Sequence, residues 1–194
     1  MKSIQRTSAS FLLRTVFLLS LLMLSTLSLR AQLSLSGGVS LGYAANLTYG
    51  ERDDNGTLAN IFADLQYNRI IGRIQYTGLL AGSFASENIE SGFGIHGSLG
   101  YNIPITEQLH LPVMLSGGAA VLTYNNGFSG SINGSGSIFT DANPQFGVTL
   151  APYFMLTEHL SVTSSLRFLR GFTVSEESET INLTDLALGI RYTF

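Results

Sequence analysis

The sequence predicts an all-β chain folded as an eight-stranded antiparallel up-and-down transmembrane β-barrel. Three observations lead to this prediction: apolar residues alternate with small or polar ones in eight runs, only 12% of residues are charged, and an apolar segment follows a basic start. Alternation with a period of two is typical of a strand that lies between two different environments. A solvated surface usually carries about twice this share of charge, so we expect the apolar faces to meet lipid.

Residues 1–31 have the three-part plan of a secretory signal peptide. A basic start runs into TVFLLSLLMLSTLSL, and a small residue, Ala31, precedes Gln32. The apolar run is short for a membrane-spanning helix of ~20 residues. We therefore expect cleavage after Ala31 and a mature barrel domain of residues 32–194. The alternative is a retained membrane anchor over residues 15–29.

Removal of this segment would leave a strongly acidic chain. Six arginines, no lysine and thirteen acids would remain, which gives a formal net charge of −7. Nucleic-acid binding relies on basic patches, so no nucleic-acid partner is expected. Cysteine is absent, which excludes disulfides, thiolate metal sites and a cysteine nucleophile. The sequence predicts no cofactor and no metal site.

The first predicted strand, residues 33–49, is longer than the five or six residues of a usual soluble strand. Its odd positions, among them Leu41, Tyr43 and Leu47, form the apolar face, and its even positions are small or polar. The same alternation recurs in seven further runs: 59–68, 73–84, 93–103, 108–123, 145–154, 160–168 and 185–194. Met114 and Leu122 break the alternation in the fifth run.

The links between these runs are alternately long and short, as in a membrane barrel. Residues 125–143 are rich in Gly, Ser and Asn, so we expect a polar loop there. The long links carry nine of the thirteen acids: Glu51, Asp53, Asp54, Glu87, Glu90, Asp141, Glu176, Glu177 and Glu179.

Aromatic residues fall where a membrane barrel needs girdles at its two interfaces. Those at the short-link end are Tyr67, Tyr101, Phe154 and Tyr192. Those at the opposite rim are Tyr43, Tyr49, Phe84, Phe93 and Phe168. Tyr124 has the wrong parity for its strand, which indicates a β-bulge nearby.

The inward faces carry the polar and charged residues of a predicted lumen network: Asp64, Gln66, Arg73, Gln75, His96, Arg167, Asp185 and Arg191. Charges inside a narrow barrel must be paired or hydrated, so we expect three arginines and two aspartates to form ion pairs. Eight strands enclose an interior just filled by side chains. This favours a packed plug, while inward glycines such as Gly94 and Gly100 leave a small pore as the alternative.

With a signal peptide, eight alternating strands and a terminal GIRYTF, the chain resembles the small outer-membrane β-barrels of Gram-negative bacteria, the family that includes outer membrane proteins A and X. The resemblance implies that Phe194, Tyr192, Ile190 and Leu188 form the signal read by the barrel-assembly machinery. It also implies an outer-membrane location, periplasmic chaperones as transient partners, contact with outer-membrane lipid and lipopolysaccharide, and a monomeric state.

Three functions are compatible with this sequence. The first is a non-enzymatic barrel that contributes to envelope integrity or surface interaction through acidic extracellular loops. The second is a small cation-preferring, porin-like channel. The third is a lipid A-modifying hydrolase that uses His96 and Ser98, since some barrels of this kind use a His and a Ser two residues apart. Parity points both residues inward, however, and no acid is clearly placed to orient the histidine.

Overall fold

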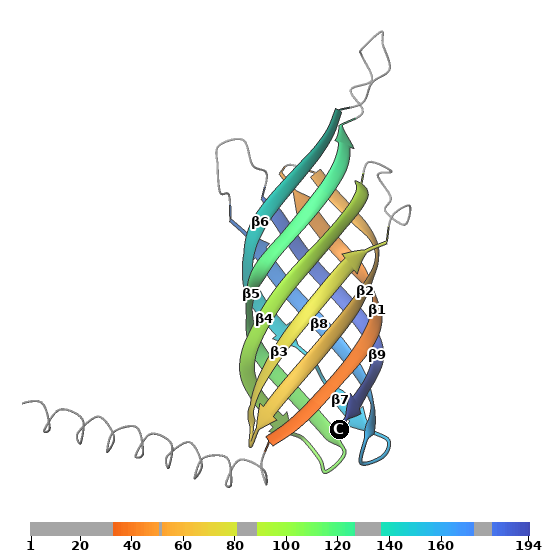
Figure 1. Cartoon of the computed structure of the whole chain (residues 1–194), viewed down its shortest axis with the longest axis vertical. Helices are drawn as coiled ribbons and strands as arrows, with labels where there is room; N and C mark the ends of the chain where they lie inside the picture. Colours follow the sequence, from red (N-terminus) through yellow and green to blue (C-terminus); the bar gives the residue numbers. More distant parts are fainter. Residues whose placement is uncertain (1–32, 51, 81–88, 127–136, 173–179) are drawn as a thin grey trace, which may run out of the picture. The chain divides into compact units, whose positions relative to one another are not determined.

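The computed structural model describes residues 33–50, 52–80, 89–126, 137–172 and 180–194 (Figure 1). The predicted signal peptide lies outside the described residues. Strand segments follow one another along the chain: β1 (Leu33–Tyr49), β2 (Arg52–Tyr67), β3 (Ile70–Leu79), β4 (Ile89–Pro104), β5 (Leu109–Asn126), β6 (Ser137–Leu150), β7 (Tyr153–Met155), β8 (Leu160–Gly171) and β9 (Ile181–Thr193). In these ranges no helix is long and apolar enough to cross a membrane.

The segments form one closed antiparallel sheet. Its order is β4-β3-β2-β1-β9-β8-β6-β5, and pairing of β4 with β5 closes the ring. β6 and β7 are two parts of one strand, because both pair with β5 on one side and β8 on the other. The strand is interrupted at Ala151 and Pro152, whose backbone groups still bond to β5 and to Ser164 of β8. The predicted eight-stranded antiparallel barrel is confirmed.

The two ends of the barrel differ in their links. Residues 68–69, 105–108 and 156–159 connect strands at one end, where Phe194 also lies (Figure 1); we call it the short-turn end. The links at the other end include the longer ranges 80–88, 127–136 and 172–180; we call it the long-loop end.

Two predicted loops at the long-loop end are partly strand. β2 begins at Arg52, so Asp53 and Asp54 lie in a strand and not in a loop. β5 and β6 continue their ladder up to the pair formed by Asn126 and Ser137, which leaves only residues 127–136 between them. For residues 125–126 and 137–143 the predicted loop is wrong, because backbone pairing alone extends this hairpin and such pairing requires no apolar face.

The outer wall of the barrel is apolar over its whole circumference. Large aliphatic side chains point outward with high exposure, for example Leu41 at 65%, Ile74 at 69% and Leu188 at 64%. Water would strongly disfavour so continuous an apolar surface, whereas lipid tails accept it. The aromatic residues predicted at the short-turn end are exposed on this wall, as are Tyr43, Phe93 and Phe168 toward the other rim. Phe84 and the side chain of Tyr49 lie outside the described residues.

A β-bulge in β1 overturns one predicted orientation. The pairing of β1 with β9 shifts between Ala44 and Asn46, so Ala45 is an extra residue. Leu41 and Tyr43 precede the bulge and point outward, but Leu47 follows it and is 2% exposed inside the barrel. An extra residue inverts the in-and-out alternation of everything beyond it, which is why the prediction of Leu47 on the outer face is wrong.

A second irregularity lies close to the one expected near Tyr124. The ladder between β4 and β5 shifts between Ile89 and Ser91, and Ile89 pairs with Tyr124. The extra residue therefore belongs to β4 and not to β5. The side chain of Tyr124 itself is outside the described part of the structure.

The interior is layered along the barrel axis. Toward the long-loop end lies an apolar cluster, which we call the apolar cap: Ala44, Leu47, Leu58, Ile89, Leu122, Leu169, Ile181, Leu183 and Ala187. Polar and charged side chains fill the middle, and Ile71, Met114 and Ala151 form a smaller cluster toward the short-turn end. The parity breaks at Met114 and Leu122 are thus inward-facing core residues.

Candidate functional site

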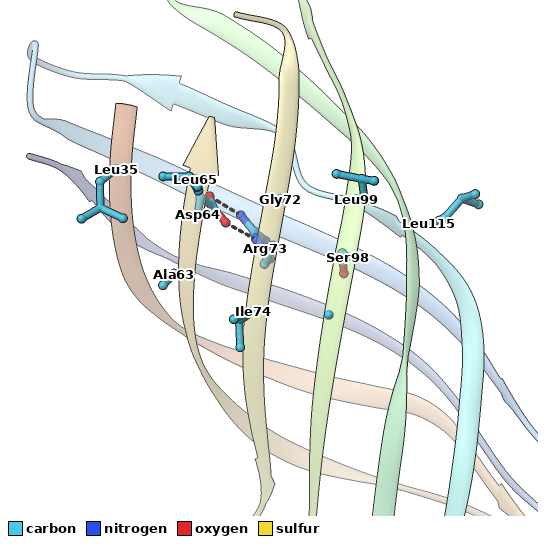
Figure 2. Close-up of a pocket in the computed structure, with 11 residues that line it drawn as sticks. Leu35, Ala63, Asp64, Leu65, Gly72, Arg73, Ile74, Ser98, Leu99 and Leu115 are labelled. Atoms are coloured by element: carbon cyan, nitrogen blue, oxygen red, sulfur yellow. Dashed lines mark hydrogen bonds and ion pairs between the residues drawn. The ribbon is translucent and has the colours of Figure 1, made fainter. Parts of the chain in front are cut away.

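The candidate site is the polar network in the barrel interior. Its first unit joins Asp64 on β2 to Arg73 on β3, which are register partners in adjacent strands (Figure 2). Arg73 Nε lies 2.6 Å from Asp64 Oδ1, and Arg73 Nη2 lies 2.9 Å from Oδ2. Arg191 on β9 donates its Nε proton to the same Oδ2 at 3.2 Å. One carboxylate with no solvent exposure therefore binds two guanidinium groups.

Aromatic rings complete this first unit. The guanidinium carbon of Arg73 lies 4.1 Å from the ring centre of Phe62, and that of Arg191 lies 4.2 Å from the ring centre of Tyr153. A cation over a ring face is attracted by its quadrupole, more strongly when both are desolvated. The rings thus partly offset the second positive charge that Asp64 alone does not balance.

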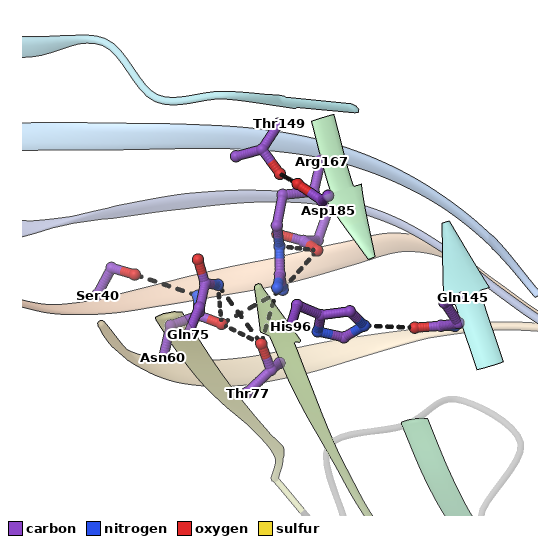
Figure 3. Close-up of polar contacts among 10 residues, drawn as sticks. Ser40, Asn60, Gln75, Thr77, His96, Gln145, Thr149, Arg167 and Asp185 are labelled. Atoms are coloured by element: carbon purple, nitrogen blue, oxygen red, sulfur yellow. Dashed lines mark hydrogen bonds and ion pairs between the residues drawn. The ribbon is translucent and has the colours of Figure 1, made fainter. Parts of the chain in front are cut away.

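The second unit links strands on opposite sides of the barrel (Figure 3). Arg167 on β8 binds its register partner Asp185 on β9, with Nη2 2.8 Å from Oδ2. Arg167 Nη1 also donates to Thr77 Oγ1 on β3 at 2.8 Å, and Nη2 donates to Asn60 Oδ1 on β2 at 3.3 Å. In the ring order, β8 and β3 are four strands apart. The Arg167 side chain therefore links opposite walls.

Uncharged residues tie this arginine to the rest of the interior. Asn60 Oδ1 also accepts hydrogen bonds from Thr77 at 2.7 Å and from Gln75 at 3.0 Å, while its amide nitrogen donates to Ser40 at 3.1 Å. Every one of these side chains is nearly inaccessible to solvent. Buried polar groups of this kind are costly unless they are paired, and here the pairs connect β1, β2, β3, β8 and β9.

His96 on β4 faces the lumen at 2% exposure and belongs to a separate chain of bonds. Its Nε2 lies 2.8 Å from Gln145 Oε1, and the Gln145 amide nitrogen donates to the Ile181 carbonyl at 2.7 Å. Because that amide nitrogen is already committed, Gln145 presents its oxygen to the ring, and His96 Nε2 must carry the proton. Nδ1 is left as a bare acceptor with no partner within the described ranges.

A small cavity lies beside His96. Its volume is about 20 Å³, and its walls include Leu47, Leu79 and Leu183 in addition to His96 and Gln145. A space of this size admits a single water molecule. The cavity is thus far below the volume of a substrate or an open channel.

The structure does not join His96 and Ser98 into a catalytic pair. Ser98 Oγ lies 2.8 Å from Ser116 Oγ, which in turn lies 2.7 Å from Thr149 Oγ1. The hydrogen bond of His96 goes to Gln145, and among the described side chains no carboxylate bonds to it. The two residues share a face of β4, as the sequence predicts, but each serves a different set of contacts.

Toward the short-turn end, Asn102 connects three strands. Its amide nitrogen donates to Gln66 Oε1 on β2 at 3.1 Å and to the Tyr153 hydroxyl on β7 at 3.0 Å. Asn60, Asn102 and Gln145 are the main members of the network that sequence analysis did not name. The alternation of the strands predicts that these side chains point inward. It does not predict whether an inward amide side chain bonds to another strand or to water.

The six titratable residues among the eight predicted for the lumen network all lie inside the barrel, although they fall into three groups. Asp64, Arg73 and Arg191 form one ion-paired unit, Arg167 and Asp185 form another, and His96 joins neither. Gln66 binds near the first unit through Asn102.

The predicted assembly-signal residues form an outward row on the closing strand. Leu188, Ile190, Tyr192 and Phe194 are 64%, 55%, 48% and 75% exposed, respectively. Phe194 N donates to the Leu35 carbonyl at 3.0 Å, and the Tyr192 and Phe194 rings meet edge to face at 5.2 Å. The final residue is thus held against β1. Recognition of this row by an assembly machinery stays a prediction.

The acids predicted for extracellular loops are divided by the structure. Asp53 accepts a 2.7 Å hydrogen bond from Thr48, and Asp54 is 5% exposed, both within β2. Glu90 and Asp141 lie within β4 and β6. The remaining five are outside the described residues: Glu51, Glu87, Glu176, Glu177 and Glu179. In the part of the chain that is described, no group of three or more His, Cys, Asp or Glu could hold a metal ion.

Comparison with solved structures gives the same architecture. Neisserial surface protein A aligns with 84% of this chain and 97% of its own, at a TM-score of 0.62 and 14% identity. Ail, the attachment invasion locus protein of Yersinia pestis, aligns with 84% and 98%, at a TM-score of 0.50 and 14% identity. No family model and no curated protein matches the sequence. The chain therefore has the fold of the small eight-stranded outer-membrane β-barrels.

Proposed function

We propose that this protein is an outer-membrane barrel without enzymatic or conducting activity. It serves as a rigid membrane scaffold that holds its rim and acidic loops at the cell surface, where they contribute to envelope integrity or surface interaction. The observation that carries the proposal is Arg167, whose side chain spans the lumen from β8 to Thr77 on β3.

A conducting path would have to pass this bridge. Arg167 is bound on both sides of the lumen, by Asp185 at one wall and by Thr77 and Asn60 at the other. To move it aside would separate a buried ion pair and leave an uncompensated charge, a change that costs about 3–5 kcal/mol. A closed state is therefore strongly favoured at mid-height.

The apolar cap adds a second barrier on the long-loop side. Leu47, Leu58, Leu122 and their neighbours are packed at 0–5% exposure. An ion that crosses this layer loses its hydration without gaining polar ligands, and an unpaired charge in an apolar environment is costly. The two barriers lie in series, so opening one alone gives no pore.

The outer-membrane location is supported by the apolar wall, the exposed aromatic residues near both rims and the fold shared with outer-membrane barrels. Cleavage after Ala31 would deliver the chain to the periplasm. Fractionation after expression in a Gram-negative host tests the location. The folded barrel should migrate differently from the boiled protein on a gel and should be found in the outer-membrane fraction; a soluble protein without such a shift would refute it.

Planar-bilayer recordings test the closed lumen. The wild-type barrel should show no steady openings, and neither should a control with Leu41→Ala, an outward side chain that is 65% exposed. A variant that combines Arg167→Ala with Leu47→Ala and Leu122→Ala weakens both barriers and should show more frequent openings than the wild type. Steady cation-selective currents from the wild type would instead establish the porin-like channel, for which Asp53 and Asp54 near the rim are the supporting observation.

The hydrolase alternative rests on His96 Nδ1, a buried acceptor without a partner in the described ranges. Mass analysis of lipid A from cells with the wild type, with His96→Asn or without the protein tests it. Unchanged acylation in all three would exclude this alternative. Acylation that depends on both the protein and His96 would overturn the non-enzymatic proposal.

A further inference from the structure

The outer wall is hollowed at one place toward the short-turn end. A groove of about 650 Å³ runs over β2, β3, β4 and β5 on the lipid-facing side, and Leu35 of β1 also lines it. Leu65, Leu99 and Leu115 form a row across it, and Gly72 on β3 interrupts that row between Leu65 and Leu99 (Figure 2). The groove is therefore a gap in the apolar surface, larger than the hollow of about 390 Å³ over β1, β2 and β9.

The packing of the barrel does not require glycine at this gap. A Cβ built on Gly72 would meet no heavy atom closer than 3.9 Å, and the same holds for Gly97 in the next row. Gly118 shows the opposite case, because a Cβ there would lie 2.1 Å from the Ile95 carbonyl oxygen. Glycine weakens a strand. Gly72 and Gly97 therefore lower the stability of their strands and leave space on the outer wall, and no contact inside the barrel requires glycine at either position.

A cation lies directly beyond the groove. Arg69, in the tight turn between β2 and β3, is exposed, and its Nη1 donates to the Tyr101 hydroxyl at 3.4 Å. Tyr101 points outward and follows Leu99 by two residues, one step of about 7 Å along the strand. Arg69 belongs to none of the three ion pairs formed by the described residues.

We propose that this groove binds one phospholipid of the periplasmic leaflet. One acyl chain lies over Gly72 between the leucines, and the phosphate is bound by Arg69 and the Tyr101 hydroxyl. Arginine is suited to phosphate by its planar set of donors, and a Tyr at the membrane interface adds a donor at headgroup level. This inference rests on the proposed insertion of the barrel in a membrane.

The chain offers matched variants for a test. Ala63 lines this groove, whereas Ala59, on the same face of the same strand, lines a smaller hollow of about 390 Å³ near Gly189. Ala63→Leu therefore fills the proposed site, and Ala59→Leu adds the same bulk elsewhere. Arg69→Gln removes the cation, and Arg170→Gln removes an exposed arginine near the other end.

The measurement is native mass spectrometry of the detergent-solubilised barrel with added phosphatidylglycerol or diacylglycerol. We expect the wild type to retain one phosphatidylglycerol and no diacylglycerol. Arg69→Gln and Ala63→Leu should each weaken retention about tenfold, while Ala59→Leu and Arg170→Gln should match the wild type. If Ala63→Leu does not fold, Gly72→Ala replaces it, since its Cβ has free space.

Three results would overturn the proposal: equal retention by Arg69→Gln, equal retention of the lipid that lacks phosphate, or a protein dimer that Ala63→Leu dissociates. The last would assign the groove to a second copy of the chain. The gel mobility of each unboiled sample is read in parallel. It reports the folded barrel independently of lipid retention, so failure of the lipid site and failure of the barrel proposal are distinguishable.

Discussion

The pair formed by Arg167 and Asp185 gives the sharpest test of the interior network. Both side chains are almost fully buried, at 2% and 0% exposure, and they are register partners on β8 and β9. Arg167→Ala leaves a carboxylate without its counterion in the lumen. Removal of one member of a buried ion pair costs about 3–5 kcal/mol, so we expect a loss of this size in the free energy of unfolding.

The paired replacement Arg167→Met with Asp185→Leu should cost less than Arg167→Ala alone. It removes both charges together and fills the space with apolar groups, an exchange that is often neutral in other proteins. The polar groups that Arg167 leaves stay satisfied, because Asn60 Oδ1 keeps its bonds from Thr77 and Gln75. The paired variant therefore leaves Asn60 Oδ1 with two hydrogen-bond donors after Arg167 is removed.

Urea unfolding of the barrel in phospholipid vesicles measures these differences, with far-ultraviolet circular dichroism and unboiled gel mobility as two readouts. Leu41→Ala on the outer wall is the control and should change the free energy of unfolding by about 0.5 kcal/mol or less. If the paired variant loses as much as the sum of Arg167→Ala and Asp185→Ala, the two residues are not coupled. The bridge would then not be what stabilises the middle of the barrel.

Three further changes test other parts of the structure. Gly118→Ala should lower the free energy of unfolding by about 1–3 kcal/mol, because the added Cβ clashes with the Ile95 carbonyl. Gly117→Ala should not, because a Cβ on Gly117 meets no heavy atom closer than 3.9 Å. Equal urea midpoints for the two variants would contradict this. Deletion of Ala45 removes the bulge in β1. Ala44 and Leu47 then still point inward, and Asn46 between them points outward, so the barrel should fold and show its gel shift. Loss of folding would refute this account of the bulge. Deletion of Phe194 should reduce the outer-membrane fraction more than export to the periplasm, and unchanged assembly would count against its predicted role as a signal.

The fold could be predicted from the sequence because the side chains of a strand alternate between two faces, so each residue points either into the barrel or toward lipid. Parity alone places Arg73, Arg167 and Arg191 inside, and the low share of charge assigns the other face to lipid. Leu47 could not be placed in this way, because a bulge is decided by backbone pairing with β9 and not by the residue types around it. Leu58 and Leu183 face the lumen for a reason that the sequence does not display, since a leucine that caps a lumen and one that meets lipid look the same.

The contacts across the lumen were also beyond prediction. Arg167 and Thr77 are 90 residues apart, and no local pattern relates them. Their encounter depends on the stagger of the ring, which determines the residues of opposite strands that lie at one height. Sequence could therefore name the charged members of the network, but not divide them into the Asp64 unit, the Arg167 unit and the separate chain of His96.

This limit points to what the network contributes to the barrel. A shift of one strand by two residues keeps every apolar side chain outside and every polar one inside, so the alternation alone does not choose between such registers. The buried ion pairs do distinguish between these registers. A shift of two residues between β2 and β3 would separate Asp64 from Arg73, and the same shift between β8 and β9 would separate Arg167 from Asp185. Each would leave buried charges unpaired, at several kcal/mol. The polar middle layer thus selects the one register in which the barrel closes.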